Sequence, residues 1–132
     1  MINSGKSCAE ITLVQYFNCT IGVARPTLDV DSSDIWSANK YWGLHGAAGA
    51  MCIGIRGVGA TVVDWEGHQG FGTGDVLRLL LDSDAGTLTV KKNGTLCGVA
   101  VTSGLTGDLC WAMSTYGAGD QVRIKAVDPR EF

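Results

Sequence analysis

The residues of this sequence that could support catalysis are few and scattered. His45 and His68 are its two histidines, and neither lies at a metal-ligand spacing from the other or from a cysteine pair. Cys52, His45 and an aspartate could form a catalytic triad in space, but no nucleophile motif accompanies the cysteine. We therefore predict no catalytic residues and a protein that is not an enzyme.

Two segments carry residue types that bind ions or phosphates in other proteins. The segment Gly70-Phe-Gly-Thr-Gly74 precedes an apolar strand-like segment and lacks the Lys-Ser or Lys-Thr of a P-loop, so it is predicted to be a turn. Asp29, Asp31 and Asp34 could offer oxygen ligands to calcium, but the positions of the EF-hand glycine and glutamate hold Asp34 and Lys40. We expect a solvated acidic loop here, with no metal and no cofactor.

The connection formed by residues 25–40 is the strongest candidate for a binding site. It is long and polar, yet it carries Trp36 and borders Tyr41, and an aromatic side chain on an ordered loop can anchor a partner. Arg25 could add a bidentate contact to a carboxylate. The alternative, that Trp36 and Tyr41 only pin the loop to a sheet, stays open. The predicted partner-binding residues are Arg25, Asp34, Trp36, Asn39, Tyr41 and Tyr116.

Composition predicts the cellular compartment and excludes some classes of partner. Ten Lys and Arg against 13 Asp and Glu give a net charge of −3, which provides no basic surface for nucleic acid. No uncharged apolar run approaches the roughly 18 residues of a membrane span, and no secretory signal pattern begins the sequence. The five cysteines are odd in number and form no Cys-x-x-Cys pair, so we predict buried thiols in a reducing, intracellular compartment.

Short strands are the elements predicted to position these residues. Nineteen glycines interrupt the apolar segments before helical periodicity can develop, whereas alternation with a period of two recurs along the chain. No repeat or linker divides the sequence, which favours a single domain over residues 1–132. The predicted strands are residues 9–14, 19–24, 50–55, 61–65, 76–81, 87–91, 95–101, 109–114 and 121–126.

The clearest local prediction is a β-hairpin centred on Asn93-Gly94. Both residue types tolerate the positive φ angles that a two-residue type I′ turn requires. The register that follows places Lys92 opposite Thr95, Val90 opposite Cys97 and Leu88 opposite Val99. With the preceding strand at residues 76–81, the hairpin is predicted to form a three-stranded antiparallel meander.

Several segments together carry a family pattern. They are Ala9-Glu10-Ile-Thr-Leu13, Ile21-Gly22-Val-Ala24, Tyr41-Trp42-Gly43, Gly74-Asp75-Val-Leu-Arg-Leu-Leu-Leu-Asp82, Gly86-Thr-Leu-Thr-Val90, Asn93-Gly94, Gly98-Val-Ala100, Gly107-Asp-Leu-Cys-Trp-Ala-Met-Ser114 and Gly119-Asp-Gln-Val-Arg-Ile124. In this order they resemble a SPRY domain over nearly the whole chain. The sequence has no room for the PRY segment of the longer B30.2 form, so it resembles a bare SPRY module.

The resemblance implies an all-β fold, a two-layer antiparallel β-sandwich of the concanavalin-like, jelly-roll kind. It also implies a non-catalytic module whose loops at one end bind a protein or peptide partner. Two alternatives remain open. The chain could be a permanent structural or accessory subunit of a larger assembly, or a lectin-like carbohydrate-binding domain that uses the acidic loop for calcium.

Overall fold

The computed structural model describes residues 2, 4–16, 19–27, 40–46, 49–55, 59–115 and 119–132. Within these residues the chain forms ten strands and a short 3-10 helix, η2, at Pro129–Glu131. The strands are β1 (Lys6–Gln15), β2 (Cys19–Ala24), β3 (Tyr41–His45), β4 (Met51–Ile55), β5 (Gly59–Val63), β6 (Val76–Asp82), β7 (Thr87–Lys92), β8 (Thr95–Val101), β9 (Cys110–Thr115) and β10 (Gln121–Val127). The all-β prediction is confirmed. In this part of the chain no helix is long and apolar enough to span a bilayer.

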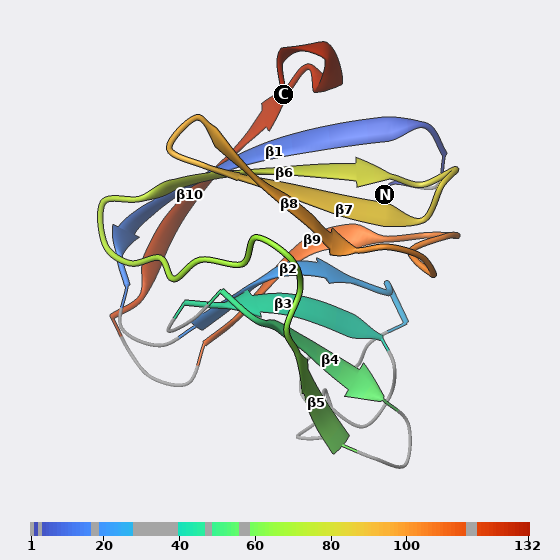
Figure 1. Cartoon of the computed structure of the whole chain (residues 1–132), viewed down its shortest axis with the longest axis horizontal. Coiled ribbons are helices and arrows are strands. Elements are labelled where there is room, and N and C mark those ends of the chain that lie inside the picture. Colours follow the sequence, from blue (N-terminus) through green and yellow to red (C-terminus); the bar gives the residue numbers. More distant parts are fainter. Residues whose placement is uncertain are drawn as a thin grey trace.

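The strands form two five-stranded antiparallel sheets that stack as layers (Figure 1). Sheet I has the strand order β10-β1-β6-β7-β8, and sheet II has the order β5-β4-β3-β2-β9. Each sheet joins strands from both halves of the sequence, since β10 pairs with β1 and β9 pairs with β2. This is the predicted two-layer sandwich.

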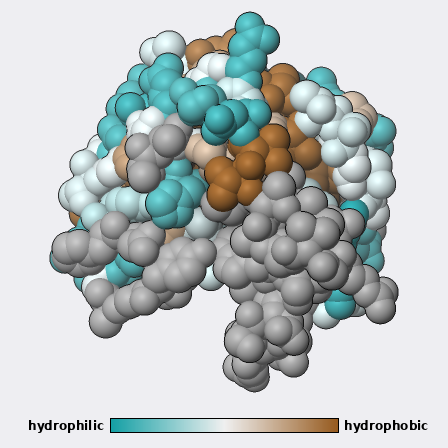
Figure 2. Space-filling view, turned by 60° about the horizontal axis from the view of Figure 1, so that its bottom comes forward, coloured by the Kyte–Doolittle hydropathy of each residue, from teal (hydrophilic) through white to brown (hydrophobic). Residues whose placement is uncertain are grey.

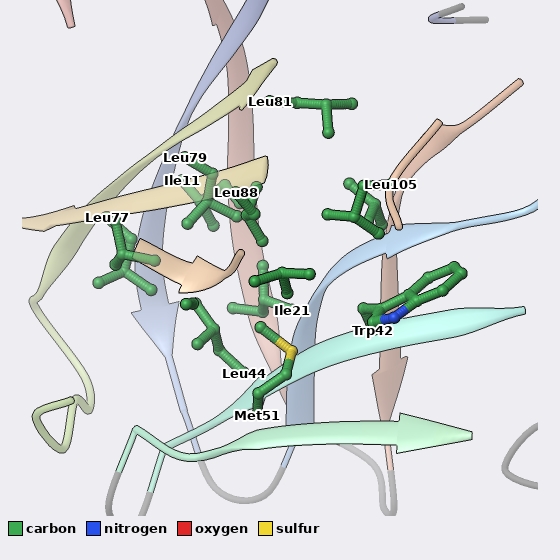
Figure 3. Packing of buried hydrophobic residues seen from close by; sticks show 14 of the residues in the cluster. Ile11, Ile21, Trp42, Leu44, Met51, Leu77, Leu79, Leu81, Leu88 and Leu105 are labelled. Carbon is green, nitrogen blue, oxygen red and sulfur yellow. The ribbon is translucent and has the colours of Figure 1, made fainter. Parts of the chain in front are cut away.

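The core lies between the sheets and follows from the alternation along each strand. In β6 the side chains of Leu77, Leu79 and Leu81 are buried, while the residues between them are only half-buried. Figure 3 shows leucines of sheet I pointing toward Ile21, Leu44 and Met51 of sheet II. Burying one face of each sheet against the other is the main stabilising contribution that this pattern predicts.

Most predicted strands are observed, and β2 has the predicted bounds. The element missing from the prediction is β3. Its first four residues are all buried, so the apolar and polar alternation that identifies a half-exposed strand is absent. Only the packing of other segments on both faces of β3 produces this burial pattern.

The β7–β8 hairpin confirms the predicted turn. Asn93 and Gly94 have φ angles of 50° and 84°, as a type I′ turn requires. The first pair, Lys92 opposite Thr95, is also as predicted.

The rest of the predicted hairpin register is wrong. Val90 lies opposite Gly98 rather than Cys97, and Leu88 lies opposite Val101 rather than Val99. The register shifts twice along the hairpin, and each shift adds a residue to β8. Gly98, at one irregularity, has a φ of 149°, and a Cβ there would lie 2.6 Å from the Glu66 carbonyl oxygen. The bulge therefore accommodates the turn at residues 65–68, which crosses the edge of β8.

Candidate functional site

The strand register brings several connections to one end of the sandwich. Ala24, the last residue of β2, pairs with Tyr41 of β3 on one side and with Cys110 of β9 on the other. The chain leaves β8 after Val101 and returns at Cys110, so residues 102–109 reach the same end. We call this the Ala24 end, and the connection of residues 25–40 begins and finishes there.

Arg25 fastens the start of this connection to the segment between β8 and β9. Its Nη2 donates to the carbonyl oxygen of Gly104 at 3.3 Å, and its Nη1 donates to those of Thr106 and of Asp108, the latter at 3.4 Å. The guanidinium carbon also lies 5.3 Å from the centroid of the Trp42 ring, a cation–π distance. The guanidinium thus joins two connections that are about 80 residues apart in sequence.

The two ends of the connection are hydrogen-bonded to each other. The Arg25 N–H donates to the Lys40 carbonyl oxygen at 2.7 Å, which extends the β2–β3 pairing beyond Ala24. The Lys40 ammonium donates to the Thr27 carbonyl oxygen at 3.3 Å. The base of the connection is therefore held by backbone and side-chain contacts.

Tyr41 is buried, with 1% of its surface exposed. Its hydroxyl lies 2.9 Å from the Thr20 hydroxyl and donates to the Thr20 carbonyl oxygen at 3.0 Å. The ring passes over Gly43, where a Cβ atom would lie 2.4 Å from the Tyr41 Cε1. The buried position favours the alternative in which Tyr41 pins the connection to the sheet.

The predicted site residues therefore divide into two groups. Arg25 and Tyr41 direct their polar groups to the chain itself, so the proposed contact between Arg25 and a partner carboxylate is not what this geometry provides. Asp34, Trp36, Asn39 and Tyr116 lie outside the described residues. Thr115, which precedes Tyr116, pairs with Cys19 at the opposite end of β2 from Ala24.

The carbonyl oxygens around Arg25 were missed by the sequence analysis. A main-chain acceptor has no residue-specific signature, because every residue carries one. Gly107 is a local sign that the chain turns here, since its φ of 79° is typical of a turn glycine. A Cβ at this position would lie 3.4 Å from the Arg25 Nη1, so glycine leaves room for the guanidinium.

The glycine-rich segment before β6 is a turn, as predicted. Gly72 donates its N–H to the Asp75 carboxylate at 2.9 Å, and the Asn93 amide donates to the same carboxylate at 3.0 Å. Burial alone would raise the pKa of Asp75, but these hydrogen bonds and the nearby Lys92 charge outweigh it and lower the pKa. The carboxylate thus ties this turn to the β7–β8 turn.

No group of three histidine, cysteine or acidic residues in the described part of the chain is placed to hold a metal ion. The calcium hypothesis depends on Asp29, Asp31 and Asp34, which lie outside that part. Cys8, Cys19, Cys97 and Cys110 are free thiols, the first two buried and the others half-buried. Burial, with a contribution from Asp120, raises the pKa of Cys19 to about 11, so this thiol is not a nucleophile at neutral pH.

The two-layer β-sandwich is similar in fold to solved SPRY domains. The SPRY domain of human HERC1 superimposes with a TM-score of 0.74 at 18% sequence identity, covering 96% of this chain and 77% of that one. Another human SPRY domain gives a TM-score of 0.66 at 16% identity, covering 93% of this chain and 86% of that one. No protein-family model and no curated protein sequence matches the chain. The fold that the sequence resemblance implied is confirmed by these structures.

Proposed function

We propose that this chain is a non-catalytic interaction module that binds a protein or peptide partner through the Ala24 end of the sandwich. The observation that carries the proposal is the bracing of the 25–40 connection by Arg25. A connection held at its base loses less conformational entropy on binding than a free one. The SPRY-domain fold of the solved relatives is consistent with such a module.

The proposed roles differ among the predicted site residues. Asp34, Trp36 and Asn39, within the connection, are proposed to touch the partner. Arg25 and Tyr41 are positioning residues, since their contacts hold the two ends of the connection. Tyr116 is a separate candidate, because the preceding Thr115 lies at the other end of β2. The free thiols support the further proposal of a reducing, intracellular compartment.

Quantitative affinity purification with Trp36→Ala tests the proposed contact. If Trp36 is a binding hot spot of about 2 kcal/mol, partner affinity should fall about 30-fold. Leu96→Ala is the matched control, because Leu96 is an exposed apolar residue of β8. It should leave partner recovery unchanged. Equal recovery by the wild type and Trp36→Ala would exclude Trp36 from the site.

Arg25→Ala distinguishes positioning from direct contact. The variant loses the carbonyl contacts and the Trp42 contact, so we expect both weaker partner binding and a lower thermal midpoint. Trp36→Ala should weaken binding without changing the midpoint. A stable Arg25→Ala protein that binds normally would contradict the positioning role.

A permanent subunit of a larger assembly is the second candidate. It is favoured by large apolar side chains that are exposed in the isolated chain, notably Val62 at 65%. Sedimentation analysis over a wide concentration range tests this candidate. A protein that stays monomeric and soluble throughout would contradict it.

A further inference from the structure

Strand β10 is an open edge of sheet I. It comes first in the strand order of that sheet and pairs with β1 along one side. Among the described residues no strand pairs with its other side. An edge of seven residues presents unpaired N–H and C=O groups that another extended segment can use.

The inner side of β10 is apolar and only partly covered, since Val122 packs against the core but Ile124 does not. Ile124 lies opposite Ile11 in the β1–β10 ladder, and directly opposed residues share a face of the sheet. Ile11 is fully buried, yet Ile124 on the same face is 50% exposed. Sheet II therefore does not extend far enough to cover this part of sheet I.

The facing edge of sheet II is also apolar. In β9, Trp111 and Met113 lie opposite Val23 and Ile21, which belong to the core, so both side chains face the space between the sheets. Met113 is 37% exposed, and Trp111 is half-buried. A cleft of about 330 Å³ opens where β9 begins and β10 ends, lined by Cys110 and Trp111 of β9, Ala126 and Val127 of β10, and residues 6–8 of β1.

The outer side of β10 is cationic. Arg123 lies opposite Thr12, and Lys125 lies opposite Glu10, so both cations are on the outer face, and both are exposed. Glu10 is shared between two cations, because its carboxylate pairs with the Arg78 guanidinium at 3.1 Å and also lies opposite Lys125, so positive charge remains in excess. Arg78 in turn lies beside Lys91 on the next strand.

Two acidic residues follow β10 and are also engaged within the chain. The Asp128 carboxylate pairs with Arg130 at 2.6 Å. The contact of Glu131 is made by its main-chain carbonyl oxygen, which accepts from Arg78 at 2.6 Å, so its carboxylate keeps its charge but is outnumbered by the cations of this face. Although the whole chain has a net charge of −3, the outer face of sheet I is thus locally basic along β10.

We propose that the free edge of β10 takes up an extended peptide segment of alternating apolar and acidic residues as an additional strand of sheet I. Side chains on a strand alternate between faces, so the apolar residues would enter the space between β9 and β10. The acidic residues would lie on the outer face beside Arg123 and Lys125, where the charges are complementary. Arg123, Ile124 and Lys125 take no part in the contacts that hold the base of the 25–40 connection, so the two proposals are tested by different residues.

A labelled peptide of sequence Glu-Val-Glu-Val-Glu-Val-Glu is the direct probe, with binding followed by fluorescence anisotropy. Two control peptides match it: one carries Lys in place of each Glu, and the other places the three Val residues together. We expect both controls to bind at least about 10-fold more weakly, because one reverses the charge and the other breaks the alternation.

Variants of β10 locate the binding. The double variant Arg123→Glu, Lys125→Glu should bind the acidic peptide at least about 10-fold more weakly than the wild type. The double variant Arg123→Lys, Lys125→Arg keeps both positive charges and should keep the affinity for this peptide within about 3-fold. Ile124→Lys should also weaken binding, because it places a charge on the apolar side. Glu66→Lys is the control for a surface charge change and should keep the affinity within about 3-fold. Glu66 is exposed and lies beside β8, at the opposite edge of sheet I from β10.

Three results would overturn the proposal. One is unchanged peptide affinity in the Arg123→Glu, Lys125→Glu double variant while circular dichroism shows it folded. Another is a set of amide chemical-shift changes that centres on the 25–40 connection rather than on β10. The third is a concentration-dependent dimer that Ile124→Lys dissociates, which would assign the edge to a second copy of this chain.

Discussion

Arg25 and Tyr41 show how the role of a single side chain depends on its acceptors. Both residue types are enriched at protein interfaces, and both flank a long connection. In the folded chain the Arg25 guanidinium meets main-chain carbonyl groups, and the Tyr41 hydroxyl meets Thr20. These contacts hold the two ends of the connection in place.

Cys19 provides a prediction at the same scale. Burial raises its pKa from the ordinary value of about 9 to about 11, so the unfolded chain loses the thiol proton at a lower pH than the folded chain. The resulting stability is present below pH 9 and should be lost as the pH rises toward 11. Urea denaturation between pH 7 and 11 measures this change. Cys19→Ala should flatten the alkaline decrease, and an identical slope in that variant would contradict the assignment.

The pairing of β2 with β3 depends on two glycines that lie opposite each other, Gly22 and Gly43. A Cβ on Gly22 would lie 1.8 Å from the Trp42 carbonyl oxygen. The absence of a side chain at Gly43 leaves room for the Tyr41 ring to cross the strand and reach Thr20. These strands can therefore carry the connection only because both positions lack a side chain.

We expect Gly22→Ala and Gly43→Ala each to destabilise the fold by about 1–3 kcal/mol, as overpacking in a buried site does. Gly72→Ala is the matched control, because no atom lies within 4 Å of a Cβ at that position. That change should stay within about 0.5 kcal/mol of the wild type. Chemical denaturation measures all three variants. A neutral Gly22→Ala variant would show that the close approach of the strands is not required.

At the scale of the whole molecule, apolar side chains at the centre of the sandwich are buried, whereas several on the described edge strands are exposed to solvent. Leucines of β6 are buried between the sheets, whereas several apolar side chains of the edge strands remain exposed. Figure 2, in which the bottom of Figure 1 comes forward, shows apolar surface near the middle of the view with hydrophilic side chains above it. The two sheets therefore stabilise each other mainly through their middle strands.

Two matched truncations measure this difference. Leu79→Ala removes a fully buried side chain and should cost about 2–5 kcal/mol of unfolding free energy. Ile124→Ala removes a half-exposed side chain from the edge strand and should cost less than about 1.5 kcal/mol, since less apolar area is lost from the interior. Urea denaturation at neutral pH compares them. Equal losses would show that the β10 edge is packed as tightly as the centre.

The sequence alone was sufficient for the all-β class, for strands such as β2 and β6, and for the Asn93-Gly94 turn. The β6 strand arises from alternation and the turn from local turn chemistry, whereas β2 is a short, mostly apolar segment that is buried at every position. Strand β3 was not predicted because it is only five residues long, has Gly43 at its centre and shows no alternation of buried and exposed residues. The predicted partners of Val90 and Leu88 in the β7–β8 hairpin were wrong because the turn at residues 65–68 crosses β8 and a bulge in β8 accommodates it.

The candidate site also combines features that the local sequence predicts with features that only the tertiary structure determines. Local sequence identified the 25–40 connection as unusual, because it is long and carries aromatic residues. Only the tertiary structure shows that Arg25 is held by carbonyl groups about 80 residues away and that Ile124 on the inner face of β10 lies beyond the cover of the opposite sheet. Contacts of this kind depend on how far each sheet extends and on where distant connections meet, and no local pattern of residues encodes either property.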